Sequence, residues 1–193
     1  MQIIVDVLCS PAKYVISNLD KVLSPLPRCP RCKKGKPHKH GLYRRFCVDG
    51  FRTLRVPVRR YYCPACGVTV SLLPSFCVPR FQYHLDVLWQ CLQWRLDEEQ
   101  SLAAIGQRLQ QRYPVIIWMP QQVRFYSQRF LDNLSRIAVV LRKAYPHIDL
   151  ADSIKKRAKK VLTAIEQGFS NPQSFAQLYF DECQCAFLAQ PRF

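Results

Sequence analysis

The chain has 193 residues, of which 49% are apolar, enough for one substantial domain or for two smaller ones with a buried core. Its formal net charge of +16 at pH 7 exceeds what solubility requires and favours a polyanionic partner, with nucleic acid ahead of a membrane surface. No run reaches the roughly 18 apolar residues of a membrane span, and Asp6 interrupts the apolar N-terminal run, so we expect a cytoplasmic, nucleoid-associated protein without a signal peptide.

The first 27 residues predict a short N-terminal strand followed by a brief helix. The strand is expected at residues 3–8 (IIVDVL), and the helix passes through Tyr14, Val15 and Leu19. The proline-rich stretch SPLPRCP then separates this segment from the next one.

Residues 28–78 predict a zinc ribbon. Two Cys-Pro-x-Cys tetrapeptides stand thirty residues apart, and the runs GLYRRFCV and LRVPVRRYYC flank an Asp49-Gly50 turn that is typical of a β-hairpin. One structural Zn²⁺ would then be held by four thiolates in a closed shell, replacing a core that so short a segment could not build. The predicted ligands are Cys29, Cys32, Cys63 and Cys66.

Other residues of this region compete for the metal. His38 and His40 are candidate ligands, but because four thiolates complete the tetrahedral shell, we expect both on a basic loop facing solvent or phosphate. Cys47 could replace a ligand, although its place in the hairpin favours packing. The remaining cysteines are expected mostly to pack as small apolar side chains: Cys9, Cys77, Cys91, Cys183 and Cys185.

Positive charge is concentrated in residues 28–60, where twelve basic residues face one acidic residue, a net charge of +11. Short strands would present these side chains rigidly, and arginine binds phosphate or guanine through two parallel hydrogen bonds. The predicted nucleic-acid contacts here are Lys33, Lys34, Lys36, Lys39, His40, Arg44, Arg45, Arg52, Arg55, Arg59 and Arg60. A solvated charged face is the alternative. The aromatic residues could stack on unpaired bases or form the buried side of the sheet: Tyr43, Phe46, Phe51, Tyr61 and Tyr62.

Residues 79–145 predict a helical domain that contains a helix-turn-helix. Leu85, Leu88 and Leu92 share one face of a first helix, Ser101 is an expected N-cap of a second, and Pro120 begins a third that continues to residue 145. In a helix-turn-helix the start of the third helix enters the major groove, where Gln pairs with adenine and Arg with guanine. The predicted contacts are Gln121, Gln122, Arg124, Gln128 and Arg129. A three-helix bundle with a solvated polar face gives the same periodicity.

Residues 146–193 predict a basic helix and a packing helix. Ile154, Ala158, Val161 and Ile165 share one side of the first, which we expect to contact phosphates rather than lie on a membrane. Its predicted contacts are Lys155, Lys156, Lys159 and Lys160. The second would bury Phe175, Leu178, Tyr179 and Phe187. The predicted fold class is therefore α+β: a small zinc ribbon with a β-hairpin, followed by a mostly helical domain.

Three motifs, HGLYRR, VRRYYCPACGVTVSLLPSFCVPR and SLAAIGQRL, resemble the zinc-ribbon and helix-turn-helix front end of bacterial insertion-sequence transposases. The similarity covers about residues 29–130 and is greatest to stand-alone bacterial proteins of unassigned function with this layout. The resemblance implies DNA recognition, of transposon ends or of an operator.

The chain departs from complete transposases in its chemistry. Two-metal strand transfer needs three convergent carboxylates on a mixed α/β core, whereas residues 79–193 read as helical and the chain has four glutamates. We therefore expect no enzyme but a sequence-specific binder of double-stranded DNA, a transcriptional regulator or an accessory subunit of a mobile element. The alternatives are an RNA-binding zinc ribbon, and an adaptor for a partner such as a transposase or integrase.

Overall fold

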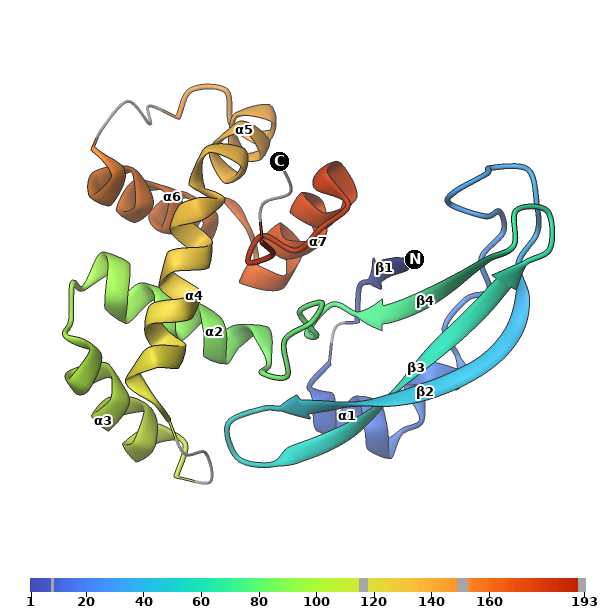
Figure 1. Ribbon diagram of the computed structural model, residues 1–193, viewed down its shortest axis with the longest axis horizontal. Helices are drawn as coiled ribbons and strands as arrows, with labels where there is room; N and C mark the ends of the chain where they lie inside the picture. The colour runs from blue at the N-terminus through green and yellow to red at the C-terminus, as the bar shows by residue number, and fades with distance from the viewer. Residues whose placement is uncertain (8, 115–117, 149–152, 191–193) are drawn as a thin grey trace.

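A four-stranded sheet forms one part of the molecule and a group of helices forms the other (Figure 1). The computed structural model describes residues 1–193 except 8, 115–117, 149–152 and 191–193. The strands are β1 (Gln2–Val5), β2 (His38–Val48), β3 (Thr53–Cys63) and β4 (Val68–Pro74). They lie in the order β1-β4-β3-β2, with β1 parallel to β4 and the other pairs antiparallel. The expected α+β class is confirmed.

The long β2–β3 hairpin turns at the predicted Asp49-Gly50 pair. One carboxylate oxygen of Asp49 accepts hydrogen bonds from the N–H groups of Phe51 and Arg52, each at 3.0 Å, and Gly50 has a φ of 98° that favours glycine. β2 begins at His38, earlier than the sequence pattern predicts. His38 and His40 therefore lie in a strand and not in a loop.

A short helical segment covers part of the sheet. It consists of α1 (Pro11–Ile16), whose N-cap is the Ser10 hydroxyl, and the 3-10 turn η1 (Leu19–Lys21). Tyr14 is fully buried, with its ring centroid 5.5 Å from that of Phe76. A small apolar cluster surrounds this pair: Val7, Cys47, Val56, Val58, Leu73 and Cys77. The expected packing role of Cys47 is met, since its side chain is buried.

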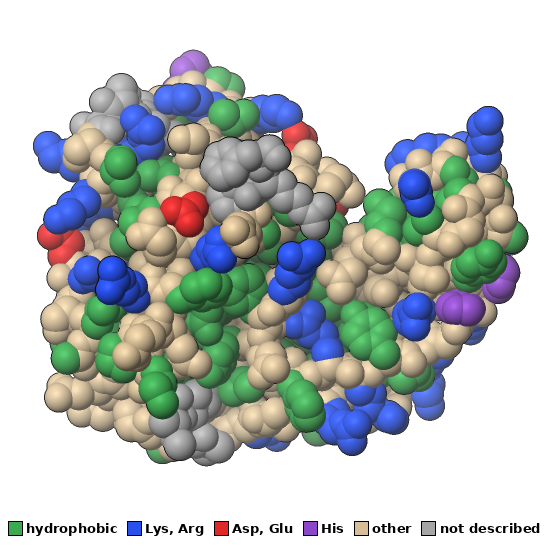
Figure 2. Space-filling view, in the orientation of Figure 1, with side chains coloured by type: hydrophobic (Ala, Val, Ile, Leu, Met, Phe, Trp, Pro, Cys, Tyr) green, Lys and Arg blue, Asp and Glu red, His purple; other side chains and the backbone are tan. Residues whose placement is uncertain are grey.

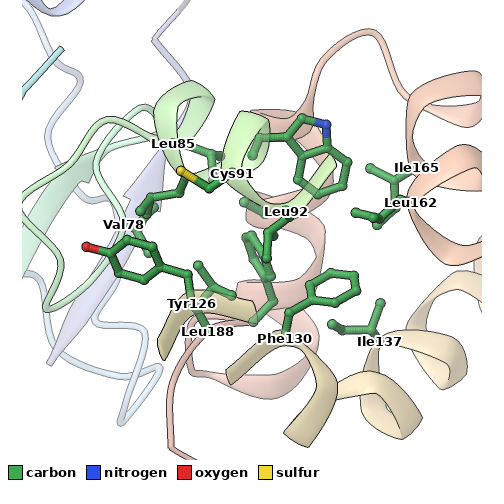
Figure 3. Packing of buried hydrophobic residues seen from close by; sticks show 14 of the residues in the cluster. Val78, Leu85, Cys91, Leu92, Tyr126, Phe130, Ile137, Leu162, Ile165 and Leu188 are labelled. Atoms are coloured by element: carbon green, nitrogen blue, oxygen red, sulfur yellow. The ribbon is translucent and has the colours of Figure 1, made fainter. Parts of the chain in front are cut away.

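The second part is helical, as predicted. Its elements are α2 (Leu85–Leu92), the π-helical turn η2 (Gln93–Asp97), α3 (Leu102–Arg112), α4 (Pro120–Asp132), α5 (Leu134–Ala144), α6 (Ile154–Gly168) and α7 (Pro172–Cys183). Figure 3 shows side chains such as Leu92, Phe130 and Ile137 meeting in the apolar core. Ser101 caps α3 by accepting a hydrogen bond from the Ala104 N–H at 3.1 Å. No helix in the described ranges is long and apolar enough to cross a membrane.

The third predicted helix is divided in two at Asn133. The buried Asn133 side chain donates hydrogen bonds to the carbonyl oxygens of Arg129 (2.9 Å) and Ala189 (2.7 Å), tying the break to the C-terminal segment. Seven residues, 113–119, separate α3 from α4. The usual helix-turn-helix has a turn of about three or four residues, so the motif remains a prediction.

Contacts from the ends of two strands, β2 and β4, join the sheet to the helices. The Val48 N–H donates to the Gln82 carbonyl oxygen at 2.7 Å, and the His84 N–H donates to the Val48 carbonyl oxygen at 2.9 Å. The Ser75 hydroxyl reaches the Gln173 side chain of α7 at 3.4 Å. Hydrogen bonds to the segment before α2 and to the start of α7 thus orient the sheet relative to the helical part.

Candidate metal centre and nucleic-acid interface

Four cysteine side chains converge at one end of the hairpin. Cys29 and Cys32 belong to the turn before β2, Cys63 ends β3, and Cys66 lies in the turn before β4. All four sulfur atoms lie within 4.8 Å of one another, and the Sγ–Sγ distances of Cys29–Cys66 and Cys32–Cys63 are both 3.7 Å. A tetrahedral ion with metal–sulfur bonds of about 2.3 Å separates its ligands by about 3.8 Å. The cluster could therefore hold a metal ion with little rearrangement.

Glycines shape both turns around the sulfur atoms. A Cβ on Gly35 would lie 2.6 Å from the Cys63 sulfur and 2.8 Å from the Ala65 Cβ, so a side chain there would push into the cluster. Gly67 has a φ of 68°, the left-handed conformation that lets the chain turn back into β4. Gly35 is therefore required because a side chain would not fit beside the sulfur atoms. Gly67 is required because of its backbone conformation.

The backbone also tunes the thiols. The Gly35 N–H donates to the Cys32 sulfur at 3.4 Å, and with the Lys34 N–H it lowers the pKa of that thiol to about 6. Desolvation raises the pKa of the Cys66 thiol to about 12. Because metal ions bind thiolates, a cation at this site must displace the remaining protons, and its retention must depend on pH.

The two histidines near the Cys-Pro-x-Cys turns pack against an aromatic ring and not in the cysteine cluster. His38 and His40 pack against the Tyr62 ring, with centroid distances of 5.6 Å and 5.5 Å. Within the described part of the chain, the four cysteines form the only group of three or more metal-ligating side chains close enough to share an ion. The choice of cysteine over histidine as ligand agrees with this geometry.

Several predicted nucleic-acid contacts have partners inside the molecule. Arg45 donates hydrogen bonds to the carbonyl oxygens of Val78, at 3.1 Å, and Phe81. Arg59 forms an ion pair of 2.8 Å with the buried Asp20. Three other predicted contacts bind an aspartate of the chain at 3.5 Å or less. Arg52 and Lys159 form ion pairs with Asp49 and Asp97, and Gln128 donates a hydrogen bond to Asp132.

The other lysines and arginines that the sequence predicts as contacts in residues 28–60 form no ion pair with any described residue. Most are exposed, and Arg60 is half-buried: Lys33, Lys34, Lys36, Lys39, Arg44, Arg55 and Arg60. Strand pairing places Phe46 beside Arg55, and Phe46 is 51% exposed. Figure 2 shows Lys and Arg side chains gathered on the part of the molecule where Figure 1 draws the hairpin. We call the seven lysines and arginines without ion-pair partners the ribbon basic face.

Some of the predicted contacts on α4 are exposed to solvent, and others bind residues of the chain itself. Gln121 and Arg124 are exposed, and the Arg129 guanidinium lies 5.0 Å from the Phe125 ring centroid. Gln122 instead accepts from the Met119 N–H at 3.2 Å and donates to the Tyr83 hydroxyl at 3.3 Å. Because its amide caps the helix, α4 offers fewer free side-chain groups for hydrogen bonds to bases than the sequence pattern suggests.

The lysines of α6 lie far from the ribbon. Lys155, Lys156, Lys159 and Lys160 are exposed on a helix that Figure 1 shows on the side of the helical part away from the sheet. The structure therefore does not bring the basic helix and the ribbon basic face together on one surface. Ile154, expected on the buried side of this helix, is 64% exposed.

Sequence reasoning missed a pocket in front of α4. Arg80, Phe81 and Tyr83 follow β4 and line it together with Phe125. The run PRFQY that carries these residues had the composition of a binding surface, two aromatic rings beside an arginine, but its position opposite α4 depends on the tertiary structure.

Comparisons with known proteins identify no relative. No family model, curated protein or solved structure matches the chain. The function must therefore be argued from the site itself.

Proposed function

We propose that the protein is a non-catalytic nucleic-acid-binding protein whose ribbon is stabilised by one structural Zn²⁺ and whose main partner is double-stranded DNA. Four thiolates are the donor set of a closed structural zinc site, and the 3.7 Å sulfur separations suit it. The ion would tie the turn before β2 to the turn after β3 and so hold the two long strands in register.

The ribbon basic face carries the proposal. Its seven basic residues stand without ion-pair partners in the described ranges, on the strands and turns that the metal site fixes. A surface kept for solubility mixes both charge signs, whereas an unneutralised basic surface on rigid strands suits phosphate oxygens at defined spacings. Arg44 and Arg55 are the side chains best placed for this role.

Recognition of the DNA base sequence by α4 is the second part of the proposal. Gln121 and Arg124 are exposed on α4, and the half-buried Arg129 follows on its third turn. These side chains offer the hydrogen-bonding groups that recognise adenine and guanine edges. A role as a regulator, or as the DNA-recognition component of a mobile element, follows from the transposase resemblance.

Salt-dependent binding tests the proposal. Fluorescence anisotropy with a labelled duplex should show affinity falling by orders of magnitude between about 50 and 200 mM salt, with a log-log slope of about −0.9 per phosphate contact. Arg44→Ala and Arg55→Ala should each flatten this slope by about one contact. Arg142→Ala, which removes an exposed arginine of α5, is the matched control and should leave it unchanged.

Structured RNA at the same salt concentration is the competing ligand. Stronger binding to RNA than to DNA of equal length would replace the duplex-DNA assignment. Affinity that does not change with salt would overturn the nucleic-acid proposal altogether.

A further inference from the structure

The first half of α4 faces a pocket of about 710 Å³. Residues 80–83, after β4, and residues 188–190 near the C-terminus also line it. Four aromatic residues cluster at this pocket, with neighbouring ring centroids 5.8–6.2 Å apart: Phe81, Tyr83, Phe125 and Tyr126. The volume lies in the range of small-ligand sites.

One of these rings is available to a ligand. Phe125 is 45% exposed although its neighbour Tyr126 is buried, so only part of its surface contributes to the core. The Arg129 guanidinium lies against this ring, and Arg80 provides a second cation in the pocket lining. Glutamine amides complete the rim, and the described residues that line the pocket include no Asp or Glu. The pocket thus combines aromatic, cationic and amide groups without a negative charge.

Arg80 connects this pocket with a second cavity. It also lines a cleft of about 930 Å³ between the ribbon and the C-terminal segment, which Arg31 of the Cys29–Cys32 turn lines as well. Arg80 has a φ of 70°, a conformation that costs energy for residues other than glycine and is often found at functional sites. The strained backbone holds this cation where the two cavities meet.

We infer that the pocket binds an unpaired nucleobase, and that the chain therefore prefers DNA in which a single-stranded segment adjoins a duplex. The inference rests on the proposed function. A base can stack on Phe125, the glutamine amides can bond its edge, and the adjoining phosphates can lie near Arg80 and Arg129. A paired base cannot enter, because its faces are covered by its neighbours in the stack.

The pocket's charge argues against an apolar peptide as the occupant. A peptide helix in a groove uses apolar anchors along its length, whereas here two arginines and several amides surround a small aromatic centre. A nucleotide supplies both an aromatic face and the negative charge that balances these cations.

Three DNA ligands test the inference by fluorescence anisotropy: a blunt duplex, the same duplex with a short single-stranded overhang, and that overhang with its bases replaced by abasic sites. The overhang should bind roughly tenfold more tightly than the blunt duplex, and the abasic overhang should lose this gain. Phe125→Ala should abolish the gain, measured as the ratio of overhang to blunt-duplex affinity, and Phe125→Trp should keep it.

Phe46→Ala is the matched control, since Phe46 is similarly exposed but lies on the ribbon. If Phe46→Ala removes the gain while Phe125→Ala keeps it, the base stacks on the ribbon and the inference is wrong. Equal affinity for the blunt and overhang ligands would also overturn it while leaving the proposed function intact. Absence of binding to any of the three would instead contradict the proposed function.

Discussion

Gly50 at the tip of the β-hairpin packs directly against the ring of Tyr113 at the end of α3. A Cβ on Gly50 would overlap this ring, and Gly50 has a φ of 98°. Phe51 adds an edge-to-face contact with the same ring at a centroid distance of 5.6 Å. The distal end of the ribbon is therefore fixed to the helical part at a point far from the metal site along the strands.

Gly50→Ala should destabilise the protein through two effects, backbone strain of about 1–3 kcal/mol and overpacking against Tyr113 of similar size. Gly41→Ala is the control, because Gly41 has a φ of 121° but open space around a Cβ. Chemical denaturation should show the larger loss for Gly50→Ala, and the loss caused by Gly50→Ala should be smaller when it is measured in a Tyr113→Ala background. Equal losses at the two glycines would contradict the packing contact.

Cys63→Ser should release the metal ion and disorder the ribbon, because one ligand of a closed shell is lost. Elemental analysis should find one zinc per chain in the unmodified protein and much less in the variant. Cys47→Ala also removes a buried cysteine of the hairpin but should retain the metal. Full zinc content in the Cys63→Ser variant would exclude these four cysteines as the ligand set.

Neighbouring arginines should separate stability from binding. Arg45→Ala removes the guanidinium donor from the carbonyl oxygens of Val78 and Phe81, of which Val78 keeps the Phe81 N–H at 3.1 Å, and should lower the free energy of unfolding by about 1–3 kcal/mol. Arg44→Ala should change stability by less than about 0.5 kcal/mol, since Arg44 is exposed, and should instead weaken DNA binding. Denaturation and anisotropy on both variants check this division, which reversed effects would refute.

Stability should fall as pH drops below about 6.5 because of His84. Burial lowers the pKa of His84 in the folded protein, while the unfolded chain takes up the proton at its ordinary pKa near 6.5. The stabilisation is thus present above pH 6.5 and is lost as pH falls towards the folded pKa. The neutral ring also caps α2, its Nδ1 accepting from the Asp86 N–H at 3.0 Å. Asp86 and Asp49 oppose the lowering without reversing it.

Thermal unfolding of His84→Asn between pH 7 and 5 measures this contribution. The variant should be less stable at pH 7 and should lose less stability on acidification than the unmodified protein. His147→Asn, at an exposed histidine, should keep the original pH profile. An unchanged profile in His84→Asn would show that other groups cause the acid sensitivity.

The sequence by itself determined the features that depend on local rules. The spacing of the Cys-Pro-x-Cys pairs and the Asp49-Gly50 turn placed four thiols at one end of a hairpin, because a hairpin brings its two ends together. Ser101 and Pro120 marked the starts of α3 and α4 through the chemistry of helix N-termini. The helical apolar repeat correctly assigned Leu88 and Phe130 to the core.

Only the tertiary structure decided what each charged residue contacts. Arg44 and Arg45 are adjacent residues of the same type. Arg44 faces solvent, whereas Arg45 bonds backbone carbonyls more than thirty residues away. The break at Asn133 depends on Ala189, and the pocket at Phe125 depends on residues 80–83. Periodicity records which face of an element is apolar, whereas the partner of a polar group is set by segments distant in sequence, which no local pattern encodes.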